Sequence, residues 1–414
     1  MDYKKIVQGI LDIGEAMLRC GAEIMRVEDS LYRMCKSYGF VRYDVWVVPS
    51  NIQMTVETQD GDVFTQVRHI KYMSTNYDRL DYLNNLSRYV CNNLPDAEQM
   101  HEKYLEVMNR PPQHPAIKYI AGVMGGTGFA VFFGSGFADA IVAVIASLAI
   151  VAVGSWISKR ENNFIVYNAV VAFIAEVIII GAVSLGFGTH ADRITIGIVM
   201  LLISALGTTN GIRDFLHADI LSGIFNIINS VLGAMGIACG IVVAMFLLPG
   251  VEVELFILNS NIVIQLISCT VACTGFAFWF KIKGIQVLYS GIGAFFTWAI
   301  YLAVYELNPS NFLATMVGAL FVSAYASVMA RVNKAPATIF LTASVFPLIP
   351  GPNLYYMMYG AINQDVKMTY EQGIILLATC VAIAFGFLIV EVANRYMVYL
   401  ARKSGKIVDT RGGV

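Results

Sequence analysis

Long apolar spans recur from residue 115 to near the end of the chain, and they limit its possible folds more than any other feature. Most of them approach the roughly 20 residues that a helix needs to cross the hydrocarbon of a bilayer. We assign about ten as transmembrane helices: Ile117–Phe133, Phe137–Ile157, Phe164–Leu185, Ile194–Gly211, Ile220–Leu248, Ile262–Phe280, Ile285–Tyr305, Phe312–Ala330, Thr338–Tyr359 and Gly373–Val398.

The composition of the chain agrees with this assignment. Of its 414 residues, 57% are hydrophobic and 14% are charged, whereas soluble chains carry about 25% charged residues. The net charge is −1, which gives no reason to expect a nucleic-acid partner. The sequence therefore predicts a polytopic α-helical membrane protein surrounded by lipid.

Basic residues in the predicted loops give the orientation. If residues 1–112 are cytoplasmic, the even-numbered helices end inside. The inside loops and the C-terminal tail then hold most of the basic residues: Lys159, Arg160, Arg213, Lys281, Lys283, Arg331, Lys334, Arg402, Lys403, Lys406 and Arg411. The outside loops hold only Arg193 and Lys367. Cytoplasmic loops are enriched in Lys and Arg, so we expect an inner-membrane protein with both termini in the cytoplasm.

Residues 1–112 are polar and mixed in charge, and they predict a small cytoplasmic α+β domain. The first twenty residues contain no uninterrupted apolar core, so we expect no cleaved signal peptide. Asp60-Gly61 is a typical hairpin turn between alternating segments. The expected elements are a helix at Met17–Tyr38, strands at Val41–Ser50, Ile52–Thr58 and Val63–Arg68, and helices at Tyr77–Cys91 and Pro95–Met108.

The predicted spans divide into two membrane halves, residues 113–250 and 251–414, with five helices each. A repeat with an odd number of spans must be inverted. The fourth span of each half carries a predicted break, at Leu206–Gly211 and at Pro347–Asn353. Interrupted helices at corresponding positions of inverted halves indicate a transporter binding site.

The segment Pro347–Asn353 is the sharpest of these features. Proline removes a backbone donor and clashes with the preceding turn, so we expect the helix to unwind near Pro350 and Gly351 and to restart near Asn353. Freed carbonyls could then bind a cation or proton donor, and helix N-terminal N–H groups could bind a carboxylate. We therefore predict substrate contacts at Pro347, Pro350, Gly351 and Asn353. The alternative is a purely structural kink.

Polar residues gather at the end of the fourth span, at Asn210, Arg213, Asp214, His217 and Asp219. Asn210 and Arg213 are candidates for substrate binding, with Arg213 on a carboxylate, and Asp214 and Asp219 are candidates for gating. The alternative is that Arg213 and Asp214 form a surface pair whose side chains reach the membrane interface.

Glu176 lies in the middle of the third apolar span. A charged side chain at that depth costs about 2.5–3.5 kcal/mol on insertion scales, so it must pair, face water or carry a proton. We therefore consider Glu176 a candidate for proton coupling. The alternative is a carboxylate buried against a polar neighbour for packing. Asp139 and Glu391 lie nearer the membrane edges and are weaker candidates.

The chain carries no motif of a known catalytic or cofactor site. It has no HExxH, Walker or GxSxG sequence, and its seven cysteines show neither CxxC nor zinc-ligand spacing. We expect no enzyme activity, metal or cofactor. A catalytic cluster of Glu23, Arg26 and Glu28 is an alternative, but these residues equally suit a salt bridge or an interface to the membrane part.

Several motifs in order resemble the threonine/serine exporter family over essentially the whole chain. Gly21–Glu28 is similar to its G-x-E-x-x-R-x-E signature, and Val48–Ser50 to the strand end that follows. Asn210–Asp214 with Ala218–Gly223 is similar to its N-x-I-R-D…D-x-x-S-G segment, and Phe346–Gly351 contains its P-L-x-P-G motif.

One departure from this family pattern precedes Asn210. The family usually has Pro-Gly there, where this chain has Ser204-Ala205. We therefore expect a gentler break in the first half than in the second.

The resemblance implies a secondary exporter of threonine and serine that is driven by the proton-motive force. Related two-subunit members export succinate, so a small dicarboxylate is the alternative cargo. An exporter predicts one midplane cavity that touches both Pro350 and the Asn210–Arg213 region. A channel or a scaffold without active transport is a further alternative. The sequence leaves open whether the chain forms a homo-oligomer.

Overall fold

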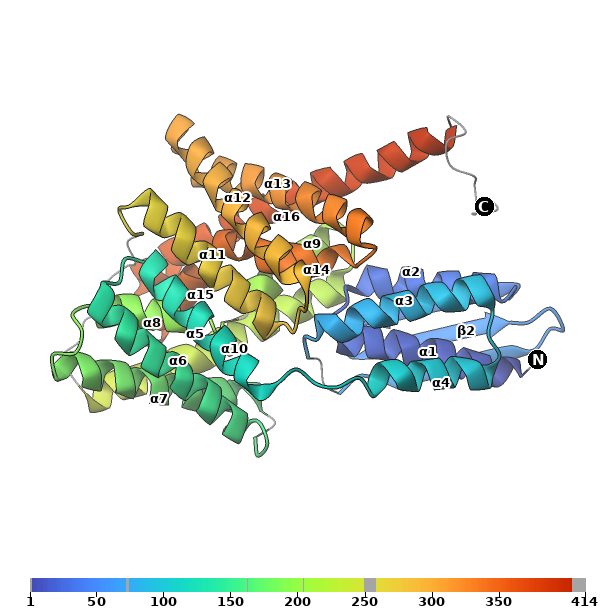
Figure 1. The fold of residues 1–414 in the computed structure, drawn as a ribbon, viewed down its shortest axis with the longest axis horizontal. Helices are drawn as coiled ribbons and strands as arrows, with labels where there is room; N and C mark the ends of the chain where they lie inside the picture. The colour runs from blue at the N-terminus through green and yellow to red at the C-terminus, as the bar shows by residue number, and fades with distance from the viewer. Residues whose placement is uncertain (1, 72–73, 162, 204, 249–257, 404–414) are drawn as a thin grey trace.

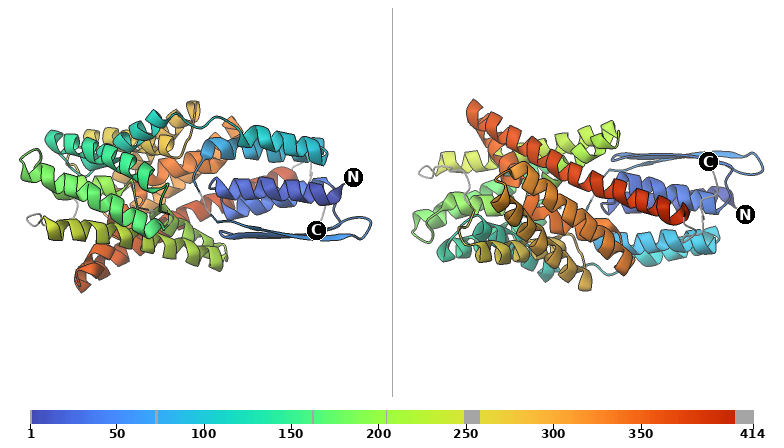
Figure 2. Two further views of the ribbon diagram at one scale, coloured as in Figure 1. Left: turned by 90° about the horizontal axis from the view of Figure 1, so that it is seen from below. Right: turned by 90° about the horizontal axis from the view of Figure 1, so that it is seen from above.

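The computed structural model describes residues 2–71, 74–161, 163–203, 205–248 and 258–403. Residues 2–109, here called the N-terminal region, lie at one end of the molecule. The helices that follow Pro115 form a larger bundle beside them (Figure 1). Viewed from the side, the N-terminal region has three layers: a sheet, the pair α1 and α2, and the pair α3 and α4 (Figure 2).

The N-terminal region contains α1 (Tyr3–Arg19), α2 (Ile24–Ser37), β1 (Arg42–Val48), β2 (Asn51–Glu57), β3 (Val63–His69), α3 (Tyr77–Asn93) and α4 (Ala97–Met108). The strands form an antiparallel sheet in the order β1-β2-β3, with Val47 opposite Ile52. On β2, Ile52, Met54 and Val56 are fully buried while the residues between them are more exposed. The predicted strands and the last two predicted helices agree with these elements within a few residues.

The single helix predicted at Met17–Tyr38 is wrong. The structure ends α1 at Arg19 and begins α2 at Ile24. Gly21 has φ +91°, a conformation that glycine adopts without strain. Its N–H donates to the carbonyl of Leu18 and the N–H of Ala22 donates to that of Met17. These bonds satisfy the free carbonyls at the helix end, as a glycine C-terminal cap does.

The larger bundle contains α5 (Pro115–Phe132), α6 (Phe137–Ile157), α7 (Phe164–Ser184), α8 (Ala191–Val199), α9 (Ala205–Leu216), α10 (Ile220–Leu247), α11 (Ile262–Trp279), α12 (Ile285–Leu307), α13 (Asn311–Asn333), α14 (Ala337–Val345), α15 (Gly351–Ile362) and α16 (Val366–Lys403). Within the described residues, 7 helices are long and apolar enough to cross a membrane, or 8 spans if one bent pair counts as one. The chain is thus a polytopic helical membrane protein. The count of ten stays a prediction, because α5 and the pair α8–α9 are not among these spans.

The break predicted at Pro347–Asn353 is confirmed. Helix α14 ends at Val345, a 3₁₀ turn covers Phe346–Leu348, and Ile349 is extended with ψ 125°. Helix α15 then begins at Gly351, bent by 57° from the helix before the break. It restarts two residues earlier than predicted, because Pro352 occupies its first turn, where a missing N–H costs nothing.

The break predicted at Leu206–Gly211 is misplaced. These residues lie inside α9, and the chain leaves the helical ladder earlier, after Val199. Gly211 serves close packing instead: a Cβ at this position would lie 2.8 Å from the carbonyl oxygen of Gly223 on α10. Glycine at such a contact lets two helix backbones approach closely.

One hydrophobic core joins the N-terminal region to the bundle. The buried side chains of Ile6, Leu31 and Ile52 belong to the same cluster as those of Ala277 and Phe340. The chain passes from the N-terminal region to the bundle near residue 112, but the buried apolar side chains of the two parts pack together as one core. This contact holds the N-terminal region against α11, α12 and α14.

Tyr77 provides further bonds across this contact. Its N–H donates to the carbonyl of Phe280 at 3.0 Å, and its hydroxyl is 2.9 Å from that of Thr342. Nearby, Lys283 forms an ion pair with Asp78 at 2.8 Å.

Candidate functional site

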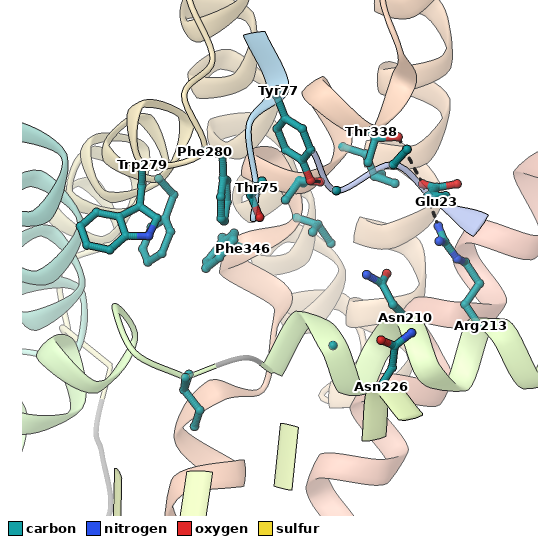
Figure 3. Close-up of a pocket in the computed structure, with 18 of the residues that line it drawn as sticks. Glu23, Thr75, Tyr77, Asn210, Arg213, Asn226, Trp279, Phe280, Thr338 and Phe346 are labelled. Carbon is teal, nitrogen blue, oxygen red and sulfur yellow. Dashed lines mark hydrogen bonds and ion pairs between the residues drawn. The ribbon is translucent and has the colours of Figure 1, made fainter. Parts of the chain in front are cut away.

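A cavity of about 400 Å³ lies where the N-terminal region meets the bundle. We call it the proximal cavity. Figure 3 shows polar side chains from both parts around it, with aromatic rings along one side. Its polar lining comes from Glu23, Thr75, Tyr77, Asn210, Arg213, Asp214, Asn226, Thr338 and Thr342. The predicted candidates Asn210, Arg213 and Asp214 thus share one cavity.

Arg213 forms the central contact of the proximal cavity. Its Nη1 donates to Oε1 of Glu23 at 3.2 Å, and the hydroxyl of Thr338 donates to the same oxygen at 3.4 Å (Figure 3). Only 12% of the Arg213 side chain is exposed, compared with 31% for Glu23. Glu23 comes directly before α2, Arg213 lies in α9 and Thr338 lies in α14. One carboxylate therefore ties the N-terminal region to both interrupted helix pairs.

The surroundings of Glu23 favour its charged form. Burial alone would raise the pKa of its carboxyl. The charges of Arg213 and Arg26, with hydrogen bonds from Arg213 and Thr338, outweigh burial and hold this pKa below its ordinary value of 4.5. Glu23 is therefore an anion at neutral pH, which strengthens its contact with Arg213.

The other polar residues predicted at this end all have partners in the protein, and His217 and Asp219 are not among the residues that line the cavity. His217 directly follows α9, and its Nε2 lies 2.9 Å from Oε2 of Glu391 on α16. Asp219 precedes α10 and accepts from the N–H of Ser222 at 3.4 Å, so it caps this helix. Asp214, which does line the cavity, accepts from Nδ2 of Asn226 at 2.8 Å.

A second cavity, of about 260 Å³, lies beside the break between α14 and α15. We call it the distal cavity. Pro347, Pro350 and Asn353 line it, together with Gln372 and Trp298. The amide of Asn353 donates to Oε1 of Gln372 at 2.8 Å. Three of the predicted substrate contacts therefore lie here, and Gly351 lies at the start of α15 next to them.

The two cavities are separated by Met200 and Phe346, which line both of them. The ring of Phe346 stacks on that of Phe276 with centroids 4.0 Å apart and also meets the ring of Phe280 at 5.7 Å. Phe346 is 6% exposed. The single midplane cavity expected from the sequence is thus divided, with Arg213 on one side of this aromatic barrier and Pro350 on the other.

Glu176 lies in neither cavity lining. It is 1% exposed, and its Oε2 accepts from the hydroxyl of Thr195 on α8 at 2.8 Å. Among the described residues, its Oε1 has no hydrogen-bond partner, and neither has the buried hydroxyl of Tyr355. Helix α8, which carries Thr195, also contacts α15. Glu176 is therefore bound to one member of the interrupted pair α8–α9, and that helix packs against the other pair, α14–α15.

The three motif residues of the N-terminal region have different partners. Glu23 faces Arg213, while Glu28 accepts from the backbone N–H of Val47 at 3.1 Å and so fixes β1 to α2. Arg26 lines a separate cavity. Glu23 thus forms the interface contact that the sequence allowed. Within the described residues, no group of three or more His, Cys, Asp or Glu side chains could hold a metal ion.

Sequence reasoning missed several residues of these cavities. Phe346 stands next to Pro347 and could have been found as a neighbour of the break. Met200 and Thr338 carry no local signal, because their positions depend on contacts between segments far apart in the chain.

Interrupted helices, cavities beside them and long apolar spans define a membrane protein with the architecture of a transporter. The threonine/serine exporter model matches residues 8–248, and a second model described as threonine/serine exporter, ThrE, matches residues 265–393. The chain belongs to the threonine/serine exporter family.

Two curated relatives span nearly the whole chain. One is named "Probable threonine/serine exporter", from Mycobacterium tuberculosis, and is 20% identical over 99% of this chain and 80% of its own length. The other is the threonine/serine exporter of Corynebacterium glutamicum, 24% identical over 92% of this chain and 80% of its own length. No solved structure matches the chain.

Proposed function

We propose that this chain exports threonine and serine from the cytoplasm as a proton-coupled secondary transporter. The observation that carries the proposal is the division of the pathway: two cavities share a wall formed by Met200 and Phe346. A transporter must expose its site to one side at a time, and a thin barrier between two cavities suits that requirement. Movement of this barrier would connect the substrate to either cavity in turn.

The two inverted halves, residues 113–250 and 251–414, are supported by the interrupted pairs. Helices α8 and α14 each have 9 residues, and α9 and α15 each have 12. Helix α9 contacts α10 and α16, and α15 contacts α16 and α10. Equivalent partners for equivalent segments are what an inverted repeat produces. In such transporters the two halves rock against each other around the site.

Arg213 is the proposed recognition group for the substrate carboxylate. Its guanidinium already binds a carboxylate, that of Glu23, at 3.2 Å, and arginine matches carboxylate geometry well. A bound amino acid would replace Glu23 on Arg213. Asn210 and Thr338 line the same cavity and are the proposed partners of the amino and hydroxyl groups. The N-terminal region would then act as a gate on the proximal cavity.

Glu176 is the proposed proton carrier. One carboxylate oxygen is held by Thr195, and the other has no partner in the part of the chain that the structure describes. Because Thr195 of α8 holds this carboxylate and α8 contacts α15, movement of the interrupted pairs would change the surroundings of Glu176. A proton could therefore bind in one state and leave in the other.

The proposed orientation places both termini in the cytoplasm. Basic loop residues meet the N-terminal region directly: Lys283 pairs with Asp78, and Arg88 donates to the carbonyl of Lys334. These loops and the N-terminal region therefore lie on one side of the membrane. The enrichment of cytoplasmic loops in Lys and Arg favours the inside.

The test is transport by the purified chain in proteoliposomes with an imposed pH gradient. We expect saturable, gradient-dependent movement of labelled threonine and serine, and its loss in Arg213→Gln. Arg42→Gln is the matched control, since Arg42 is exposed on β1 and pairs with Asp44. Movement of succinate without movement of threonine or serine would identify the cargo as a dicarboxylate. Movement that ignores the gradient and does not saturate would indicate a channel.

A further inference from the structure

The N-terminal region contains a polar cavity that the transport proposal does not use. It has a volume of about 660 Å³ and lies between α2 and α3. Three arginines line it, Arg26, Arg33 and Arg88, and its carboxylates are Glu23 and Asp29. Most of the other lining residues are serine or asparagine. The lining is therefore rich in hydrogen-bond donors.

Both carboxylates of this cavity are already paired with arginine. Arg33 binds Asp29 at 2.7 Å, and Glu23 binds Arg213 in the proximal cavity. Arg26 and Arg88 form no ion pair with any residue that the structure describes. One N–H group of Arg88 donates to the carbonyl of Lys334 at 3.3 Å, which leaves the other donors of its guanidinium for a ligand. Two arginines thus bring positive charge to the cavity without a close ion-pair partner among the described residues, although Arg26 acts on the Glu23 carboxyl from a greater distance.

Two buried donors at this cavity have no acceptor. Asn84 is 5% exposed, and its Nδ2 has no hydrogen-bond partner among the described residues. The same is true of the buried Nε of Arg26. Buried donors are nearly always satisfied, and an exception calls for a water, an ion or a ligand. Unsatisfied donors beside two arginines call for an acceptor with negative charge.

We propose that this cavity binds a small oxyanion, either a carboxylate or a phosphate, through Arg26, Arg88 and Asn84. Guanidinium groups bind both kinds of oxyanion with paired hydrogen bonds. The amide of Asn84 would supply a further donor from the buried wall. The proposal concerns binding and does not depend on the direction or cargo of transport.

Glu23 gives the site a route to the transport pathway, and this step alone rests on the proposed function. Glu23 lines both this cavity and the proximal cavity. An anion bound to Arg26 would add negative charge beside the carboxylate that holds Arg213. The site would therefore influence how firmly the N-terminal region closes the proximal cavity.

The binding test uses the purified full chain in detergent micelles. Its thermal unfolding temperature is measured against increasing inorganic phosphate and, separately, succinate, with ionic strength held constant by chloride. We expect saturable stabilisation by at least one of them. Arg88→Gln should weaken binding about tenfold or more, because it removes a charged donor. Because the Arg88 side chain is exposed, we expect this variant to fold normally. Arg26→Gln and Asn84→Ala should also weaken binding.

Two controls separate this site from the transport pathway. Arg42→Gln and Arg213→Gln should both keep the saturable stabilisation. Absence of saturation with both anions would overturn the proposal, and so would unchanged affinity in Arg88→Gln. Loss of stabilisation in Arg213→Gln with full retention in Arg88→Gln would also overturn it, because the anion would then act in the proximal cavity. A failure of transport leaves these measurements unaffected.

Discussion

Nη1 of Arg213 and Oε1 of Glu23 lie 3.2 Å apart, although 190 positions of sequence separate them. The contact joins α9 of the bundle to the residue that precedes α2. Because Thr338 donates to the same carboxylate oxygen, α14 shares the contact. The junction of the N-terminal region with the bundle therefore contains one ion pair that three distant segments build together.

Glu23→Gln and Arg213→Gln should each destabilise the protein, by about 1–3 kcal/mol, since each leaves a polar group without its charged partner. The double variant should lose less than the sum of the two, because the second change removes a group that is already unpaired. Thermal unfolding of the four proteins in detergent measures this coupling. Glu98→Gln, on the first turn of α4, is the matched control. Strictly additive losses would show that the contact contributes nothing to stability.

Acid should weaken the same contact. The folded protein holds the pKa of Glu23 below 4.5. Stability from this group is therefore fully present above its unfolded pKa and is lost as pH falls through the lower folded value. The unfolding temperature should decline below about pH 4.5, and less steeply in Glu23→Gln. Parallel pH profiles of the two proteins would assign the acid sensitivity to other groups.

Phe346→Ala should connect the proximal and distal cavities and turn regulated transport into leakage. Truncating a buried phenylalanine costs about 3–5 kcal/mol in a close-packed core, and less where the ring borders cavities. The measurement is passive loss of preloaded threonine from proteoliposomes without a gradient. Phe296→Ala is the control, because the Phe296 side chain is 49% exposed on α12. Equal leakage from both variants would exclude Phe346 as the barrier.

Glu176→Gln should separate transport from the proton gradient. The amide keeps the size of the side chain and can still accept from Thr195, but it cannot release a proton. Gradient-driven threonine movement should be lost, while exchange between labelled and unlabelled threonine should continue. Glu306→Gln, near the exposed end of α12, should leave both activities unchanged. Normal gradient-driven threonine movement in Glu176→Gln would show that Glu176 is not the proton carrier.

Gly351→Ala should disturb the barrier between the two cavities by displacing Met200. A Cβ at Gly351 would lie 2.5 Å from Sδ of Met200, so Met200 must move. We expect slower transport, and recovery when Met200→Ala provides the missing space. Overfilled contacts commonly cost about 1–3 kcal/mol. The rates of the single and double variants test this, and a double variant slower than Gly351→Ala would contradict the assignment of Met200.

How far the sequence predicts this structure depends on where each signal originates. The break at Pro350 could be predicted because proline disrupts a helix by its own geometry. The break after Val199 contains no proline, and the glycines placed nearby in the sequence serve packing instead. The turn at Gly21 has a local cause, a positive φ in glycine, but it was hidden within an amphipathic pattern. A break can be predicted from the sequence when a single residue determines the backbone conformation there, and it is missed when contacts with other helices determine it.

The candidate site was predictable in part for the same reason. Asn353 is a polar group in an apolar span and Arg213 lies just after the end of one, and such groups stand out in a sequence. The sequence gives no sign that Met200 and Phe346 separate these two residues. That separation results from Phe346 stacking on Phe276, which lies in a different helix. The partner of Arg213 was likewise beyond reach. Glu23 was singled out in its own motif, but nothing local joins the two residues.

The hydrophobic core that runs from the N-terminal region into α11, α12 and α14 has a consequence for biogenesis. The ribosome completes Val107 long before it reaches Ala277, and both belong to that core. At usual synthesis rates the interval is on the order of 10 to 30 seconds. Throughout it, the first segment made must wait with apolar surface uncovered. Membrane insertion of the later helices therefore sets the time at which the earliest part of the chain can finish folding.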